Sequence, residues 1–490
     1  MTAAAFPLVI QGGMGIAVSN WRLALAVSSA GQLGVVSGTA LDSVFIRRLQ
    51  DGDPGGAMRH ALEHFPMPDV AGELLARYFR PEGRAPGEPY KALSMYKQAV
   101  SSMREQVTIA ANFVEVFLAK EGHTGKVGIN LLTKVQMPNL ASLYGAMLAG
   151  VDVVLMGAGI PREIPGALDA LAQHAPATLR FDVAGQPSDE PLTLTFDPAR
   201  HGATGTPVER PQFYAIVSSH ALATTLLRKA TGKVDGFVVE GATAGGHNAP
   251  PRGALKLNEL GEPIYGERDD VDLSVMRDLG APFWLAGGFG NPEGLLEARR
   301  QGAAGVQVGT PFAYADESGL SAEVKRQVLG DVAAGRVGIF TDPRASPTGF
   351  PFKVIKAPSL VQQDDSRVRL CDLGYLREAA RRPEDGRVVY KCSSAPVDEY
   401  VNSGGTVEET VGRRCLCNGL MAVIGLPQLR KDGSLEAPLL TSGDAVTQLA
   451  AVAKGRTSYT AHDVLEYLLA GVESESVTRV GAAPVEALGG

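Results

Sequence analysis

The sequence contains little cysteine, only four residues in 490. A secreted domain held together by disulfides has a much higher cysteine content. A signal peptide pattern is also missing, because such a leader starts with a basic stretch and no positively charged residue precedes Arg22. These absences predict a cytoplasmic protein.

The sequence also lacks a strong charge of one sign and a long apolar run. Lys and Arg number 46 against 53 Asp and Glu, a net charge of −7 without a block of like charges. We therefore expect neither a nucleic-acid partner nor an anionic membrane surface. The longest apolar stretch, 143–160, contains Asp152 and several glycines, which is typical of a buried helix, turn and strand. The pattern indicates a soluble protein that does not span a membrane.

What the sequence does contain is a series of eight short apolar runs. Helix-like stretches lie between them, for example 21–30, 140–149 and 292–301. Parallel strands need crossover connections, and eight such units close into a filled barrel. The pattern predicts an α/β protein with a (β/α)8 TIM barrel, with a doubly wound open sheet as the alternative. The predicted strands are 8–11, 33–37, 127–131, 151–156, 213–218, 236–240, 283–286 and 305–308.

Two gaps between these runs are too long for one crossover helix. The first, about 41–120, ends in a long helical stretch, 90–120, and predicts an inserted helical segment. The second, about 162–210, contains alternating runs at 178–183 and 192–196. Turn residues separate these runs, so we expect a β-hairpin there.

The region after the last predicted strand is less regular. We expect the barrel domain to cover 1–320 and an irregular extension or cap to cover 321–470, where all the cysteines lie. The final residues, 471–490, are expected to form a tail with little order.

Glycines follow three of the predicted strands. In a TIM barrel the active site lies at the carboxyl ends of the strands, where glycine lets the backbone approach a ligand and point N–H groups at a phosphate. No Gly-x-Gly-x-x-Gly opens a strand-to-helix unit near the start, so a mononucleotide such as FMN is a better fit than a dinucleotide. The candidates are Gln11, Gly12, Gly13 and Met14 after the first run, Gly287 and Gly288 after the seventh, and Gly309 and Thr310 after the eighth.

A histidine stands in the segment that follows the sixth run. His247 comes directly after Gly245 and Gly246, in a stretch that begins at Glu240. At the mouth of a barrel such a histidine can reach a substrate, and its pKa suits proton transfer near neutral pH. His247 is therefore the candidate general base.

These residues together resemble the nitronate monooxygenase family, formerly called 2-nitropropane dioxygenases. The resemblance covers roughly residues 6–320 and rests on Gln11-Gly12-Gly13-Met14-Gly15, Gly128-Ile129-Asn130-Leu131, Ala244-Gly245-Gly246-His247, and the glycine motifs between 285 and 310. It implies an FMN-binding barrel that oxidises alkyl nitronates with O₂ to a carbonyl compound and nitrite, with His247 as base. It also implies that Gly12, Gly13, Met14 and Asn130 meet the isoalloxazine, that Gly287, Gly288, Gly309 and Thr310 meet the phosphate, and that Ala244, Gly245 and Gly246 belong to the same cofactor site.

The sequence leaves two reactions, and therefore two classes of substrate, open. In the family's usual form Glu-Ala stands directly before Gly-Gly-His, whereas here Glu240 is separated from that motif by a longer stretch. The barrel also resembles the flavin-dependent enoyl reductases of polyunsaturated fatty acid and polyketide synthases. A third hypothesis is a non-catalytic flavin-binding subunit of a larger assembly. The expected partners are a small-molecule substrate and O₂, and the oligomeric state is open.

The cysteines gather late in the chain, at Cys371, Cys392, Cys415 and Cys417. Four thiolates can form a tetrahedral zinc site or hold an iron–sulfur cluster, although the Cys-x-Cys pair is tighter than the usual ligand spacing. The alternative is that they are free thiols packed as small apolar side chains. Both interpretations stay open at this point.

Overall fold

A computed structural model describes residues 6–202, 205–382 and 384–480. Its centre is an eight-stranded parallel sheet in the order β1-β10-β9-β8-β7-β4-β3-β2. The two end strands meet through Leu33, which receives a backbone hydrogen bond from Gln11 and donates one to Val9, so the sheet closes into a barrel. The strands are β1 (Val9–Gln11), β2 (Gly34–Ser37), β3 (Val127–Leu132), β4 (Val153–Gly157), β7 (Gln212–Val217), β8 (Gly236–Glu240), β9 (Phe283–Ala286) and β10 (Gly305–Val308).

The closed barrel confirms the predicted fold class, and each of the eight predicted runs overlaps one of its strands. Strands buried on both faces are apolar at successive positions, which is why continuous runs identified them. The open-sheet alternative was wrong, because β1 and β2 are joined at Leu33.

The inside of the barrel is filled by side chains. One cluster contains Ile10, Val35, Leu155, Tyr214 and Trp284, which come from different strands. The rings of Tyr214 and Trp284 stack with centroids 4.8 Å apart, and the Trp284 indole donates to the Pro7 carbonyl at 2.8 Å. Because the interior is packed, a ligand is held at one end of the barrel and not within it.

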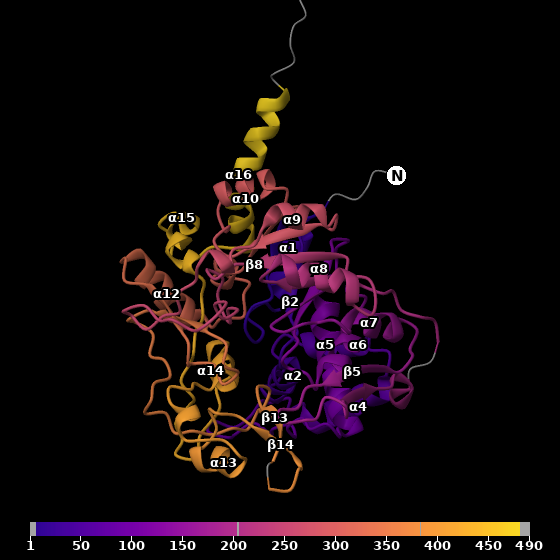
Figure 1. Ribbon diagram of the computed structural model, residues 1–490. Coiled ribbons are helices and arrows are strands. Elements are labelled where there is room, and N and C mark those ends of the chain that lie inside the picture. Colours follow the sequence, from indigo (N-terminus) through magenta and orange to yellow (C-terminus); the bar gives the residue numbers. More distant parts are fainter. Residues whose placement is uncertain (1–5, 203–204, 383, 481–490) are drawn as a thin grey trace, which may run out of the picture.

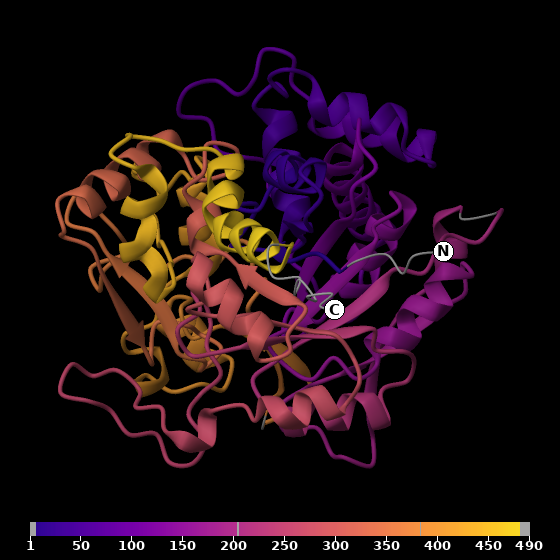
Figure 2. The ribbon, with the colours of Figure 1, turned by 90° about the horizontal axis from the view of Figure 1, so that it is seen from above.

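Helices surround the barrel between successive strands. They are α1 (Trp21–Ser29), α6 (Asn139–Leu148), α7 (Ile164–Ala172), α8 (His220–Lys229), α9 (Leu273–Asp278), α10 (Pro292–Arg300) and α11 (Thr310–Ala313). Several begin at a side-chain cap, such as Asn20, whose amide oxygen accepts from the Leu23 N–H at 3.0 Å. Figure 2 shows these helices arranged around the strands.

The first long gap contains α2 (Leu41–Gln50), α3 (Ala57–Glu63), α4 (Pro68–Tyr78) and α5 (Ser102–Lys120). An inserted helical segment is thus present, but the expected helix over 90–120 was wrong in its first part. The helix starts only after Ser101, whose hydroxyl caps the Arg104 N–H. The preceding residues are held against α2 instead, since the Lys91 N–H donates to the Gln50 side chain at 2.7 Å. In the second gap, β5 (Ala177–Phe181) and β6 (Leu192–Phe196) form the predicted antiparallel hairpin.

Residues 321–470, called the C-terminal extension below, lie beside the barrel (orange and yellow in Figure 1). Their strands form two antiparallel hairpins, and most of their helices are short. The strands are β11 (Gly338–Asp342), β12 (Phe352–Lys356), β13 (Glu378–Arg381) and β14 (Val388–Lys391), and the helices are α12 (Ala322–Ala333), α13 (Val397–Asn402), α14 (Leu416–Val423), α15 (Leu449–Ala453) and the start of α16 (Ala461–Val480).

The last helix, α16, continues into the segment expected to be a tail. That expectation is corrected for the residues up to Val480, and its remainder, 481–490, lies outside the described residues. None of the helices in the described ranges combines the length and the apolar character that a membrane crossing needs.

Candidate active site

A cavity of about 450 Å³ opens at the carboxyl ends of the barrel strands. Small-molecule sites in proteins typically enclose about 300–1,000 Å³. Strand β3 and the loops after β1, β2, β4, β7, β8, β9 and β10 form one side of the cavity, and the C-terminal extension forms the other. The sequence-predicted residues that line it are Gly12, Gly13, Met14, Asn130, Ala244, Gly245, Gly246, His247, Gly287, Gly288, Gly309 and Thr310.

Gln11 is the one predicted cofactor residue outside the lining. Its side chain is fully buried beneath the first loop. The amide donates to the Gly12 carbonyl at 2.5 Å and to the Ser19 hydroxyl at 2.9 Å, and its oxygen accepts from the Val35 N–H at 3.1 Å. Gln11 therefore shapes the loop that carries Gly12 and Gly13 and does not itself face the cavity.

The loops of the barrel mouth approach each other so closely that some positions accept only glycine. A Cβ on Gly13 would lie 2.3 Å from the Cβ of Asn130. Gly287 has a φ of 85°, and a Cβ there would lie 2.9 Å from the Thr243 hydroxyl and 3.0 Å from the Ala244 nitrogen. Both glycines are therefore required by the geometry of the cavity wall.

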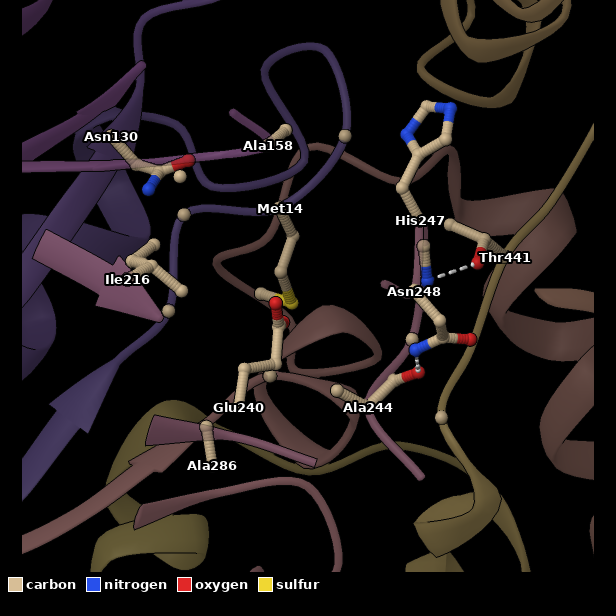
Figure 3. A pocket seen from close by; sticks show the side chains of 18 of the residues that line it. Met14, Asn130, Ala158, Ile216, Glu240, Ala244, His247, Asn248, Ala286 and Thr441 are labelled. Atoms are coloured by element: carbon tan, nitrogen blue, oxygen red, sulfur yellow. Dashed lines mark hydrogen bonds between the residues drawn. The ribbon is translucent and has the colours of Figure 1, made fainter. Parts of the chain in front are cut away.

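The C-terminal extension completes this side of the cavity with residues 441–444. The Gly246 N–H donates to the Thr441 hydroxyl at 2.8 Å, and the Gly443 N–H donates to the Thr310 hydroxyl at 2.9 Å. The first of these bonds is drawn in Figure 3. Sequence reasoning missed this segment, since it follows no barrel strand and forms no recognisable motif.

His247 stands where the barrel and the extension meet (Figure 3). Its imidazole packs against the ring of Phe352, with centroids 4.9 Å apart, and its Nε2 lies 2.7 Å from the Ser346 hydroxyl. The backbone on either side is fixed by β12, because the Lys353 N–H donates to the Gly246 carbonyl at 2.9 Å. Burial, and secondarily the nearby charge of Lys134, lower the pKa of His247 well below its usual value. The imidazole is therefore neutral at pH 7.

Two further ionisable groups belong to this region, and sequence reasoning gave neither a role. Burial raises the pKa of Glu240 to about 7, and the charge of Lys134 opposes that rise. Burial lowers the pKa of Lys134 to about 7, opposed by Glu240. The Lys134 ammonium lies 4.7 Å from the ring centroid of Phe350 and has no hydrogen-bond partner among the described residues. The available signal for Lys134 was its place just after a predicted strand.

The side chains that the extension contributes to the cavity are mostly apolar. Together they form an apolar compartment beside the glycine-rich barrel mouth. Val18 and Leu320 also contribute to this compartment from the barrel side. The apolar members from the extension are Phe350, Phe352, Leu376, Leu416, Leu420, Val423 and Leu440.

The four cysteines are free thiols. Burial raises the pKa of Cys371 to about 12 and that of Cys415 to about 11, which keeps both thiols protonated. Within the described residues, His, Cys, Asp and Glu side chains form no group of three or more placed to hold a metal ion. A zinc or iron–sulfur site at these cysteines is thus unconfirmed, and Cys417 alone of the four lines the cavity.

Comparison with known proteins points to one family. Residues 208–337 match the family model of nitronate monooxygenase. Over these residues the chain is similar to that family. The match covers β7, β8, β9 and β10 with the loops that carry His247, Gly287 and Gly309.

The individual relatives include proteins with two different activities. The chain is 29% identical over 193 residues to a nitronate monooxygenase of Pseudomonas aeruginosa, which covers 39% of this chain and 48% of that protein. It is 27% identical over 233 residues to a (3aS,4S,5R,7aS)-5-hydroxy-7a-methyl-1-oxo-octahydro-1H-indene-4-carboxyl-CoA dehydrogenase of Mycobacterium tuberculosis, covering 46% of this chain and 58% of that protein. The chain thus spans only about half the length of these curated relatives. The structure of FabK from Thermotoga maritima has a TM-score of 0.45 and 16% identity, over 98% of this chain and 96% of that chain.

Proposed function

We propose that this protein is a flavin-dependent oxidoreductase that holds FMN in the cavity at the barrel mouth. The observation that carries this proposal is the cavity of about 450 Å³ at the barrel mouth, whose wall contains Gly287 among several other glycines. Backbone N–H groups without side chains suit a monophosphate. Gly288, Gly309 and Thr310 line the same wall and would hold the phosphate with it.

The barrel side of the cavity suits the flavin ring. Gly12, Gly13, Met14 and Asn130 line it, and the buried Oε1 of Gln307 has no hydrogen-bond partner in the described part of the chain. An unsatisfied buried polar atom is costly, so a polar ring edge placed there would stabilise the site. Ala244, Gly245 and Gly246 would enclose the cofactor from the next loop.

The reaction that we propose is the oxidation of an alkyl nitronate by O₂ to a carbonyl compound and nitrite. FMN, when bound, supplies the electron transfer. His247, held neutral by burial and by Lys134, takes the proton from the carbon beside the nitro group of a neutral nitroalkane. The ammonium of Lys134, in its charged form, favours the anion that this step creates.

The test is product analysis with purified, FMN-loaded protein. We expect a preformed nitronate to consume O₂ and release nitrite. Absence of nitrite with several nitronates of different chain length would overturn the reaction while leaving FMN binding to be measured separately.

A second candidate reaction is the reduction of an enoyl group on an acyl chain. The apolar compartment around Leu416 and Leu420 favours it, because a small nitroalkane does not need that much apolar surface. This reaction would take its electrons from NAD(P)H, so rapid oxidation of NADPH by an enoyl thioester would identify it. A protein that binds FMN and turns over neither class of substrate would instead be a flavin-binding subunit.

A further inference from the structure

A serine from the extension touches the candidate base. Ser346 lies in the loop between β11 and β12 and is fully buried. Its hydroxyl oxygen is 2.7 Å from Nε2 of His247, although the two residues are 99 positions apart in the chain. Because Nε2 is bonded to Ser346, Nδ1 is the ring nitrogen left for a substrate in the cavity.

The loop that carries Ser346 is held in place independently of His247. The Arg413 guanidinium donates to the carbonyls of Ser346 and Arg344, the latter at 2.8 Å. The next residue, Arg414, donates its N–H to the Ala345 carbonyl at 2.8 Å. These contacts fix the hydroxyl before any ligand arrives, so its bond to the imidazole restrains the ring and not the reverse.

The contacts around Ser346 are compatible with two arrangements of the hydrogen-bonding protons. Its oxygen accepts from the Thr348 N–H at 3.2 Å and lies 2.8 Å from the Thr348 hydroxyl. In one arrangement, Nε2–H of His247 donates to Ser346, and the Ser346 hydroxyl donates to Thr348. In the other, the Thr348 hydroxyl donates to Ser346, which donates to a bare Nε2. A serine oxygen can accept two bonds and donate one, so both arrangements satisfy it.

We propose that Ser346 is a positioning residue for His247 that accepts the Nε2 proton and so leaves Nδ1 as a free proton acceptor facing the cavity. The inference rests on the proposed role of His247 as a base, because only an unprotonated Nδ1 can take a proton from a substrate. In the opposite arrangement Nδ1 carries the proton, and the neutral ring could only donate it. The arrangement of the Ser346–Thr348 hydroxyl pair thus decides whether His247 faces the substrate as a base or as an acid.

Nuclear magnetic resonance of the full-length protein labelled with ¹⁵N-histidine tests this directly. The signals of His247 are assigned by their loss in His247→Gln. At neutral pH we expect Nε2 to carry the proton, Nδ1 to carry none, and the Nε2–H proton to be protected from exchange with water. In Ser346→Ala that protection is lost, whereas Ser346→Thr, which keeps the hydroxyl, retains it.

The matched control is Ser359→Ala, which removes another hydroxyl of the extension, one that donates to Asp331 at 2.9 Å. It removes a hydroxyl that makes no contact with His247 and should leave the His247 signals unchanged. A proton found on Nδ1, or His247 signals that do not respond to Ser346→Ala, would overturn the proposal. If the Thr variant fails to fold, the Ala variant and its control still decide.

Activity gives a second readout. We expect Ser346→Ala to lower kcat for a neutral nitroalkane about five- to tenfold, the effect of one lost hydrogen bond, with little change in KM or in turnover of a preformed nitronate. Equal loss on both substrates would contradict a role in proton transfer. The resonance measurement needs no turnover, so a protein that oxidises no nitronate yet shows the Ser346-dependent Nε2–H would lose the proposed function and keep the positioning role.

Discussion

The barrel and the C-terminal extension contribute different things to one cavity. The barrel supplies loops in which glycine is sterically required, such as those of Gly13 and Gly287. The extension supplies the apolar compartment, the Ser346 hydroxyl that bonds to His247, and the segment 441–444. In the function that we propose, the barrel binds the cofactor, whereas the extension lines the path of the substrate and holds the base.

The largest expected effect concerns His247, which lies on a barrel loop and is contacted by Ser346 and Phe352 of the extension. His247→Ala should lower kcat/KM for a neutral nitroalkane by about 10²–10⁴, the usual loss when a general base is removed. A preformed nitronate needs no deprotonation, so its oxidation should change much less. Steady-state assays of nitrite release measure both, with His60→Ala, which removes a side chain bonded to Glu121 on the surface, as the control. Equal losses on the two substrates would make His247 a binding residue.

The next effect isolates the barrel. Gly287→Ala should weaken FMN binding about 10–100-fold, because the added Cβ meets Thr243 and the Ala244 backbone. Gly150→Ala is the matched control, since Gly150 also has a positive φ, 72°, but open space around its Cβ position. Both variants should lose about 1–2 kcal/mol of stability from the left-handed backbone, and Gly287→Ala should lose more because of its contacts. Fluorescence titration with FMN measures the affinities, and similar affinities in the two variants would place the phosphate elsewhere.

The third effect concerns the charge of Lys134, which acts on His247. Lys134 lowers the pKa of His247, so Lys134→Met should raise it. A base is active only when unprotonated, and the acidic limb of the pH–rate profile should therefore move to higher pH. In the wild type this acidic limb should lie well below the usual range of a histidine, because burial holds the pKa of His247 low. A limb that stays in place after the substitution would show that Lys134 does not act on His247.

The smallest effect isolates the extension. Thr441→Val removes the hydroxyl that accepts from the Gly246 N–H, and FMN should bind about fivefold more weakly as a result. The shape of the side chain is kept, so the apolar compartment should be intact. Thr225→Val on α8, whose hydroxyl bonds only within its own helix, is the control for loss of a threonine hydroxyl. An unchanged FMN affinity would assign residues 441–444 to the substrate alone.

How much the sequence predicted also differs between the two regions. The barrel strands are buried on both faces, so their apolar runs and the glycines after them are visible in the sequence. The start of α5 was missed because residues after Tyr90 bind α2 through Gln50, a tertiary contact that overrides local helix preference. Ser346 and Thr441 follow no periodic pattern, and their place at the cavity depends on long-range packing.

The most direct test of the account is anaerobic mixing of the FMN-loaded protein with one electron donor at a time. A nitronate, without O₂, should bleach the flavin absorbance rapidly, and NADPH should do so slowly or not at all. The opposite order, fast bleaching by NADPH and none by nitronates of any chain length, would contradict nitronate oxidation and make the apolar compartment of the extension a site for an enoyl substrate.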